Sequence, residues 1–170
     1  MITIQKASIS DANDILDIAK TTFSETFLEH NSIENLNLYL YTNLTFKIVE
    51  KQLQNPNSIF YLAKKENAIV GYLKMNFAAA QTELQDIQSL EIERIYVLKS
   101  HHGQKIGQAL MNKAIGIAIQ SNLQYIWLGV WENNTKGIDF YLKNGFETFQ
   151  THIFMIGNDA QNDFLMKLII

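Results

Sequence analysis

The chain has no cysteine and a single proline among its 170 residues. Without cysteine it cannot form a disulfide framework, a thiolate metal site or a cysteine nucleophile. It also lacks an excess of positive charge, because its formal net charge is −3 at pH 7. Proteins that bind nucleic acids usually carry a basic patch, so we expect no nucleic-acid partner.

Long apolar runs are missing as well. The first residues, MITIQKASISDAND, lack the charged-then-apolar layout of a signal peptide, and no apolar run approaches bilayer length. We therefore expect a cytoplasmic protein that does not associate with membranes. His101 and His102 have no carboxylate or further histidine at ligand spacing nearby, so we expect no metal site.

The remaining composition is that of a globular protein, with 47% apolar and 18% charged residues. The sequence contains no repeat, no low-complexity stretch and no linker. Its length suits one domain with a proper core, so we expect residues 1–170 to form a single domain.

Hydrophobic periodicity and turn residues divide the chain into strands and helices. The expected elements are a strand at 2–6, a helix capped by Ser10 or Asp11, one or two helices within 32–54, strands at 59–64, 68–77 and 90–97, a helix from 106, a strand at 125–130, a helix at 134–142 and two final strands. This order predicts an α/β fold of the mixed α+β kind, in which helices cover both faces of a mixed sheet.

The stretch IERIYVLKSHHGQKIGQALMNKA, residues 92–114, runs from a strand through a glycine-bearing loop into a helix. At such a helix start the backbone N–H groups have no internal partner, and the helix dipole favours negative charge. Gly103 and Gly107 would let a phosphate approach closely. The spacing matches neither the Walker loop nor the dinucleotide fingerprint, so an ordinary strand-to-helix turn remains the alternative.

A second stretch, WLGVWENNTKGIDFYLKNGF at residues 127–146, contains a strand, an asparagine-rich cap and a helix. With it the sequence resembles the GCN5-related N-acetyltransferase superfamily, whose later motif is Asn-x-x-Ala-x-x-x-Tyr-x-x-x-Gly-Phe. The residues that match this motif, with glycine in place of alanine at the second position, are Asn134, Gly137, Tyr141, Gly145 and Phe146.

The resemblance implies that superfamily's fold, with a mostly antiparallel sheet of about six or seven strands. It also implies acetyl-CoA as cosubstrate, bound mainly through backbone groups. The pantetheine arm would run along Ile95, Tyr96 and Val97. The diphosphate and the rest of the cofactor would contact His102, Gly103, Gln104, Lys105, Ile106, Gly107, Gln108, Asn134, Tyr141 and Lys143.

Position 105 departs from the superfamily's cofactor motif, Arg/Gln-x-x-Gly-x-Gly/Ala. His102 stands for Arg/Gln, Lys105 for the first glycine and Gly107 for the second. If residue 105 is already helical, its Cβ is tolerated and its ammonium could reach a CoA phosphate. The alternative is a solvated surface lysine.

Acetyl transfer to an amine requires the neutral amine, whereas a primary alkylamine at pH 7 is almost entirely charged, a deficit of about 4–5 kcal/mol. A carboxylate, or a water held by one, can accept that proton. Glu91 and Glu93 lie two apart in a strand and should share one face, with Ile92 and Arg94 on the other. Glu91 corresponds best to the superfamily's base and Glu93 second. The alternative for Glu93 is a surface ion pair with Arg94 or a lysine.

Tyr141 corresponds to the superfamily's general acid, which protonates the departing thiolate; the alternative is simple packing. Asn134 can cap its helix, contact the pantetheine, or do both. Trp127 and Trp131 lie on one strand face and are expected to form core or pocket wall.

The segments SLEIERIY, NKAI and IWLGVWE resemble bacterial spermidine/spermine N-acetyltransferases of the Pai type. This closer resemblance implies a polyamine acceptor, which Glu25, Glu29 and Glu34 on the N-terminal helices could attract. An amino acid or peptide N-terminus is the alternative acceptor, and a non-catalytic acyl-CoA-binding domain is the alternative class. A homodimer is compatible with the sequence, which does not fix the oligomeric state.

Overall fold

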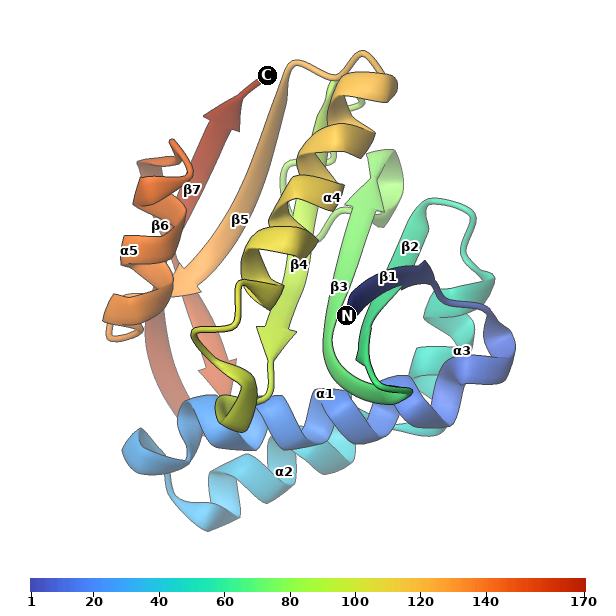
Figure 1. Ribbon diagram of the computed structural model, residues 1–170. Helices are drawn as coiled ribbons and strands as arrows, with labels where there is room; N and C mark the ends of the chain where they lie inside the picture. Colours follow the sequence, from blue (N-terminus) through green and yellow to red (C-terminus); the bar gives the residue numbers. More distant parts are fainter.

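The computed structural model describes all residues, 1–170, and contains one seven-stranded sheet of order β1-β2-β3-β4-β5-β7-β6 (Figure 1). The strands are β1 (Ile2–Lys6), β2 (Ser58–Lys65), β3 (Ala68–Phe77), β4 (Ser89–Val97), β5 (Tyr125–Trp131), β6 (Glu147–Ile156) and β7 (Asp159–Ile169). The α-helices are α1 (Ala12–Phe27), α2 (Ile33–Asn43), α3 (Phe46–Gln54), α4 (Ile106–Gln120) and α5 (Thr135–Lys143). Only β4 and β5 pair in parallel, so the expected mixed, mostly antiparallel sheet is confirmed.

Helices cover both faces of the sheet, as predicted. The face that carries α1, α2 and α3 has one apolar core, which includes Ile15, Phe23 and Phe60. The face that carries α4 and α5 has a second core, which includes Leu110 and Tyr141. None of the helices is long and apolar enough to cross a membrane.

A Schellman motif ends α5 and directs the chain back into the sheet. The N–H of Gly145 donates to the carbonyl of Leu142 at 3.0 Å, and the N–H of Phe146 donates to that of Tyr141 at 3.1 Å. Gly145 has φ +89°, a left-handed conformation that favours glycine. The turn buries Phe146 against Tyr141, with ring centroids 5.9 Å apart, and thereby fixes the Tyr141 ring.

The parallel pair β4–β5 is short. It comprises three residue pairs, Ser89 with Tyr125, Leu90 with Ile126 and Glu91 with Trp127. Beyond Glu91 the two strands separate, and Figure 1 shows their C-terminal ends diverging below α4. The second half of β4 therefore has no strand partner on the side facing β5.

A β-bulge in β4 corrects the predicted side-chain alternation. Lys74 of β3 is opposite Arg94, and the next residue, Met75, is opposite Ile92, so Glu93 is the extra residue. One extra residue in a strand moves each side chain that follows it to the opposite face of the sheet. Arg94 therefore lies near Tyr39 and Tyr72 on the α1–α3 face with Glu93, whereas Ile92 packs in the opposite core. The expectation that Ile92 and Arg94 share a face was wrong.

Two glycine-to-alanine substitutions should change stability in opposite directions. Gly145→Ala forces a Cβ into the left-handed region, 3.2 Å from Leu168 Cδ1, and should lower the free energy of unfolding by about 1–2 kcal/mol. Gly116→Ala, inside α4 with no atom within 4 Å of its Cβ, should raise it by about 0.5–1 kcal/mol. Urea denaturation measures both, and equal effects would contradict the assigned backbone conformations.

Candidate active site

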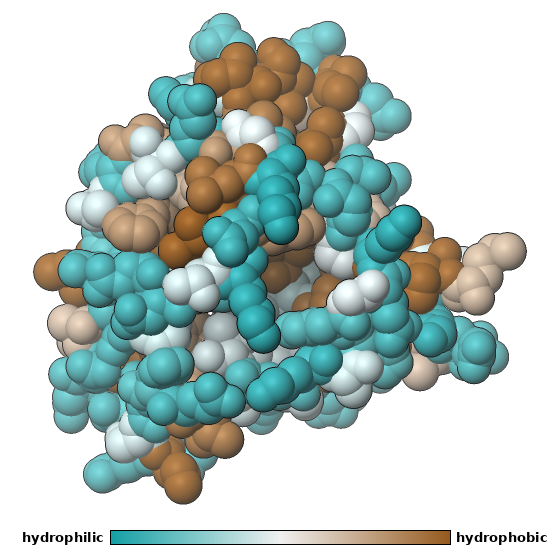
Figure 2. All heavy atoms as spheres, turned by 60° about the vertical axis from the view of Figure 1, so that its left-hand side comes forward, coloured by the Kyte–Doolittle hydropathy of each residue, from teal (hydrophilic) through white to brown (hydrophobic).

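A cleft of about 1550 Å³ opens where β4 and β5 separate. Its wall comes from β4, the start of α4, β5, α5, the β6–β7 hairpin and the C-terminal part of α1. Figure 2 shows a hollow rimmed mainly by hydrophilic residues. The volume exceeds the roughly 300–1,000 Å³ of an ordinary small-molecule pocket, so the cleft has room for two ligands.

One end of the cleft is the turn that opens α4, where the sequence predicts the cofactor's diphosphate. None of the backbone N–H groups from Gly103 to Gln108 donates a hydrogen bond within the chain, and the first that does is Ala109, to the Lys105 carbonyl at 3.0 Å. Gly103 has φ +77°, and nothing lies within 4 Å of the position of a Cβ there. Six free donors at a helix N-terminus, without obstruction at Gly103, fit a diphosphate.

Lys105 is the N-cap of α4 and has φ +62°, so it is left-handed and not helical. The condition under which its Cβ would be tolerated therefore does not hold. The superfamily's glycine is the residue that this conformation favours, and a lysine there stores backbone strain.

The other residues of the turn have distinct contacts. The His102 ring nitrogen Nε2 lies 2.8 Å from the Val97 carbonyl and ties the loop to the end of β4. The Gln104 side chain points away and accepts a hydrogen bond from Lys65 at 2.9 Å. The expected cofactor residues that line the cleft are Ile95, Tyr96, Val97, His102, Gly103, Lys105, Ile106, Gly107, Gln108, Asn134 and Tyr141. Gln104 and Lys143 do not line it.

Tyr141 lies on α5 and lines the cleft with a side chain that makes no hydrogen bond. The residue is 8% exposed, and burial raises the pKa of its phenol above that of free tyrosine. The hydroxyl therefore carries its proton at neutral pH and has no partner within the chain.

Asn134 caps α5, as predicted, because its Oδ1 accepts the N–H of Gly137 at 3.0 Å. A Cβ at residue 137 would lie 2.6 Å from Asn134 Nδ2. Glycine at this position, where the superfamily has alanine, therefore lets the Asn134 side chain fold tightly over the helix start.

Glu91 is buried and accepts three hydrogen bonds. Its donors are Asn76 Nδ2 at 2.9 Å, the Thr82 N–H at 2.9 Å and the Thr82 hydroxyl at 2.5 Å. Burial raises the pKa of this carboxyl although these hydrogen bonds oppose the shift. The result is a cleft carboxylate that binds a proton more readily than an exposed glutamate.

Glu93 forms a half-buried ion cluster with two cations. It pairs with Lys74 and, at 3.2 Å, with Arg94, and it also accepts a hydrogen bond from Asn76 at 2.6 Å. Burial alone would raise the pKa of Glu93, but the charges of Arg94 and Lys74 outweigh it and hold the pKa below its usual value. The predicted ion pair is present, although in the cleft and not on a solvated face.

The far end of the cleft contains residues that the sequence did not single out. His152 of β6 lies between two carboxylates, with Nδ1 2.5 Å from Glu83 and Nε2 3.5 Å from Asp163. Gln81 holds the loop that carries Glu83 by accepting a hydrogen bond from the Trp127 indole at 2.9 Å. These residues come from a polar loop and a C-terminal hairpin that have no motif, so no sequence pattern pointed to them.

Unpartnered polar atoms gather in the same cleft. Three buried side-chain atoms of cleft residues have no hydrogen-bond partner, namely Arg94 Nη1, Trp131 Nε1 and Asp163 Oδ1. Buried polar groups are normally satisfied, so such a group of exceptions indicates a surface that binds a ligand.

The three expected acceptor residues lie at or beyond the rim. Glu25 accepts the backbone N–H of Lys99 at 2.9 Å, and Glu29 lies 3.5 Å from the Lys99 ammonium. Both line the cleft, whereas Glu34 is exposed on α2 and does not. Glu25 and Glu29 therefore tie α1 to the loop that precedes α4.

Comparison with known proteins identifies the family. Residues 12–146 match the Acetyltransferase (GNAT) family. The chain belongs to the GNAT family. The resemblance found in the two sequence motifs is thus confirmed, and the protein is an acetyl-CoA-dependent GNAT N-acetyltransferase.

Several relatives align with nearly the whole length of this GNAT protein. An uncharacterised N-acetyltransferase from the pepI 3′ region of Lactobacillus delbrueckii subsp. lactis is 34% identical over 98% of this chain and 96% of its own. A spermidine N(1)-acetyltransferase of Thermoplasma acidophilum is 26% identical over 88% and 91%. The crystal structure of the PaiA N-acetyltransferase of that organism, in complex with coenzyme A, superposes with a TM-score of 0.83 at 22% identity and covers 100% and 99% of the two chains.

Asp163 should make the stability of this GNAT protein depend on pH. Burial, reinforced by Glu83 and Glu132 and opposed by His152, raises the pKa of Asp163 to about 6. A raised folded-state pKa means that ionisation, between roughly pH 4 and 6, costs stability, and that this cost is fully present above pH 6.

Asp163→Asn removes that cost. The melting temperature of the variant should therefore exceed that of the wild type at pH 7.5, with a much smaller difference at pH 4. Scanning calorimetry across this range measures the difference. A difference in melting temperature that does not change with pH would contradict the claim that ionisation of Asp163 costs stability.

Proposed function

We propose that this GNAT enzyme transfers the acetyl group of acetyl-CoA directly to a primary amine of a polyamine such as spermidine or spermine. The observation that carries the proposal is a single cleft with free backbone amides at one end, carboxylates at the other and the Tyr141 hydroxyl in its wall. Direct transfer needs these parts along one path.

The chain's own groups are suited to hold acetyl-CoA, which supplies a reactive thioester. The amides of residues 103–108 would bind the diphosphate. The edge of β4 at Ile95, Tyr96 and Val97 that faces away from β3, and that β5 leaves free, would bind the pantetheine arm. These contacts come from backbone, so they tolerate the changes at His102 and Lys105.

Glu91 is the better of the two candidate bases. Its raised pKa suits it to accept the amine's proton, directly or through a water. Glu93 is neutralised by Lys74 and Arg94, which stabilise its charged form and weaken it as a base. Asn76 donates to both carboxylates and couples their positions.

Tyr141 is the proposed acid. Its protonated phenol would donate to the departing CoA sulfur, and the Schellman turn after α5 holds the ring that carries the hydroxyl. The absence of any internal partner leaves this donor available.

A polyamine acceptor is favoured by the excess of carboxylates in the cleft and by the spermidine N(1)-acetyltransferase among the relatives. Six carboxylates line the cleft, against four side chains that are always cationic. The carboxylates are Glu25, Glu29, Glu83, Glu91, Glu93 and Asp163, and the cations are Arg94, Lys99, Lys105 and Lys136. The unpartnered Nη1 of Arg94 would suit an acceptor carboxylate, which keeps an amino acid or peptide N-terminus as the second candidate.

The cofactor assignment predicts that Gly107→Val weakens acetyl-CoA binding at least tenfold. A Cβ at residue 107 meets only Phe140 and Val97 at 3.8–4.0 Å, so the variant should fold and place its methyl groups in the cofactor's space. Isothermal calorimetry gives the affinity, and Gly116→Ala, on the same helix but outside the cleft, is the control. Unchanged affinity in a folded Gly107→Val protein would rule out diphosphate binding at residues 103–108.

The acid assignment predicts that Tyr141→Phe keeps the packing against Phe146 but loses the proton donor. Positioned acid catalysis is worth about 10²–10⁴ in rate, and a thiolate leaves easily, so kcat should fall by about 10². The KM for acetyl-CoA should change little, because the lost interaction acts mainly in the transition state. Steady-state thiol release measures kcat and KM. A near-normal kcat in the variant would show that Tyr141 contributes packing and no acid catalysis.

A further inference from the structure

A notch interrupts the wall of the cleft along β5. Trp127, Leu128, Val130 and Trp131 are buried, whereas Gly129 between them is exposed to the cleft. The two tryptophans share the face of Gly129 but point to different partners: the Trp127 indole to Gln81 and the Trp131 ring to Phe27 at 5.4 Å. The missing side chain at Gly129 therefore leaves a narrow opening beside Asp163 and Leu165, whose atoms lie 3.5 Å from the position of a Cβ there.

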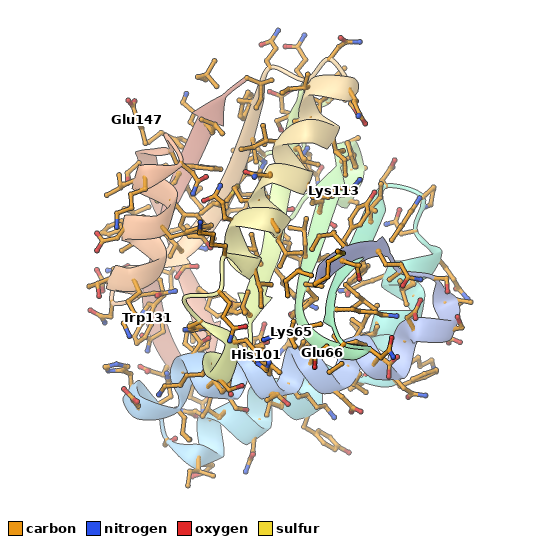
Figure 3. All side chains as sticks on the ribbon, viewed as in Figure 1. Lys65, Glu66, His101, Lys113, Trp131 and Glu147 are labelled. Atoms are coloured by element: carbon orange, nitrogen blue, oxygen red, sulfur yellow. The ribbon has the colours of Figure 1, made fainter.

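A carboxylate stands at the side of this notch. Asp163 of β7 is directly opposite Trp131 in the sheet, and its Oδ2 lies 3.5 Å from the position of a Cβ at Gly129. On the next strand His152 is opposite Asp163, and Glu83 contacts His152 at 2.5 Å. The row therefore presents two carboxylates and one histidine to the notch. Figure 3 shows the end of this row, Trp131, where β5 ends above α1.

Two polar atoms near the notch lack a partner within the chain. Asp163 is 13% exposed, yet its Oδ1 is buried and makes no hydrogen bond. Trp131 is 5% exposed, and its indole N–H is also unpartnered. Unsatisfied buried polar groups are exceptional. An ammonium could complete the Asp163 oxygen, whereas the Trp131 N–H is a donor and needs an acceptor.

The chemistry of the reaction determines which part of an acceptor belongs here. A carboxylate stabilises a neighbouring ammonium in its charged form. That effect would hinder the reacting nitrogen, which has to lose its proton, but it favours a second nitrogen that does not react. The close approach of Asp163 and Leu165 to Gly129 keeps the opening narrow, so it admits a slim amine and excludes bulky substituents.

We infer that the notch at Gly129, beside the carboxylate of Asp163, binds a second, non-reacting cationic nitrogen of the acceptor, with His152 and Glu83 holding Asp163 in place. The enzyme thereby selects slim di- or polyamines over monoamines. This inference rests on the proposed function and specifies its acceptor.

The experiment compares two acceptors with the same five-carbon chain, 1,5-diaminopentane and pentylamine, in wild type, Asp163→Asn and Gly129→Ala. The first variant removes the charge at constant shape. The second adds a Cβ that makes only ordinary 3.5 Å contacts with Asp163 and Leu165, so it fills the notch without disturbing the strand. Glu147→Gln is the matched control, because Glu147 is an exposed carboxylate of the same hairpin, outside the cleft and far from Trp131 (Figure 3).

Wild type should prefer the diamine. Each of the two notch variants should raise the KM for the diamine about tenfold, the effect of one lost charge contact in a half-buried site. The KM for pentylamine and for acetyl-CoA should change less than about twofold in all variants. Glu147→Gln should leave all three values unchanged.

Equal changes for both amines, or no preference for the diamine in wild type, would overturn the inference. Calorimetric binding of the two amines to the protein saturated with CoA separates this result from a failure of the proposed function. If wild type turns over neither amine but binds the diamine selectively, and Asp163→Asn loses that selectivity, the notch stands and the catalytic proposal fails. If acetyl transfer occurs but the variants bind both amines as wild type does, the notch alone fails.

Discussion

The separation of β4 from β5 after only three residue pairs is the constraint on which the rest of this structure depends. It leaves the second half of β4 without a strand partner on the side facing β5 and opens the cleft into which α4, α5 and the β6–β7 hairpin direct their ends. The bulge at Glu93 belongs to the same distortion, because it turns both Glu93 and Arg94 toward the cleft. A continuous sheet at this position would bury those groups and close the path between the two ligands.

One end of the cleft presents mainly backbone groups, and the other presents mainly side chains. The end at the start of α4, where we propose that the cofactor binds, presents mainly backbone N–H groups, whose geometry depends on chain conformation and hardly on side-chain identity. The opposite end, where we propose that the acceptor binds, includes side chains from a loop and two strands, among them Glu83, His152 and Asp163. A single substitution there changes charge or shape directly. This difference explains physically how one fold can keep its cofactor while its acceptor changes.

Several ionisable groups in and around the cleft are buried, and burial disfavours their charged forms. Burial raises the pKa of Glu91 and Asp163 and lowers that of Lys74. Replacing such groups by apolar ones often costs no stability, so their presence is better explained by chemistry than by folding. Tyr141 follows the same rule, since its ring contributes to packing while its buried hydroxyl has no partner within the chain and is free for the proposed catalytic role.

The sequence by itself determined the order of strands and helices, the family and the glycine-bearing turn before α4. It also determined the elements on which Glu91, Asn134 and Tyr141 lie. These features follow from local periodicity, caps and short motifs, which act between residues near one another in the chain. It did not determine which side Arg94 faces, because one extra residue in β4 reverses the alternation without changing the pattern of residue types. The approach of Glu83, His152 and Asp163 across the cleft was decided by the tertiary structure alone. Pairing of β6 with β7 places His152 opposite Asp163, and the loop that carries Glu83 reaches His152 from 69 residues away without any shared motif.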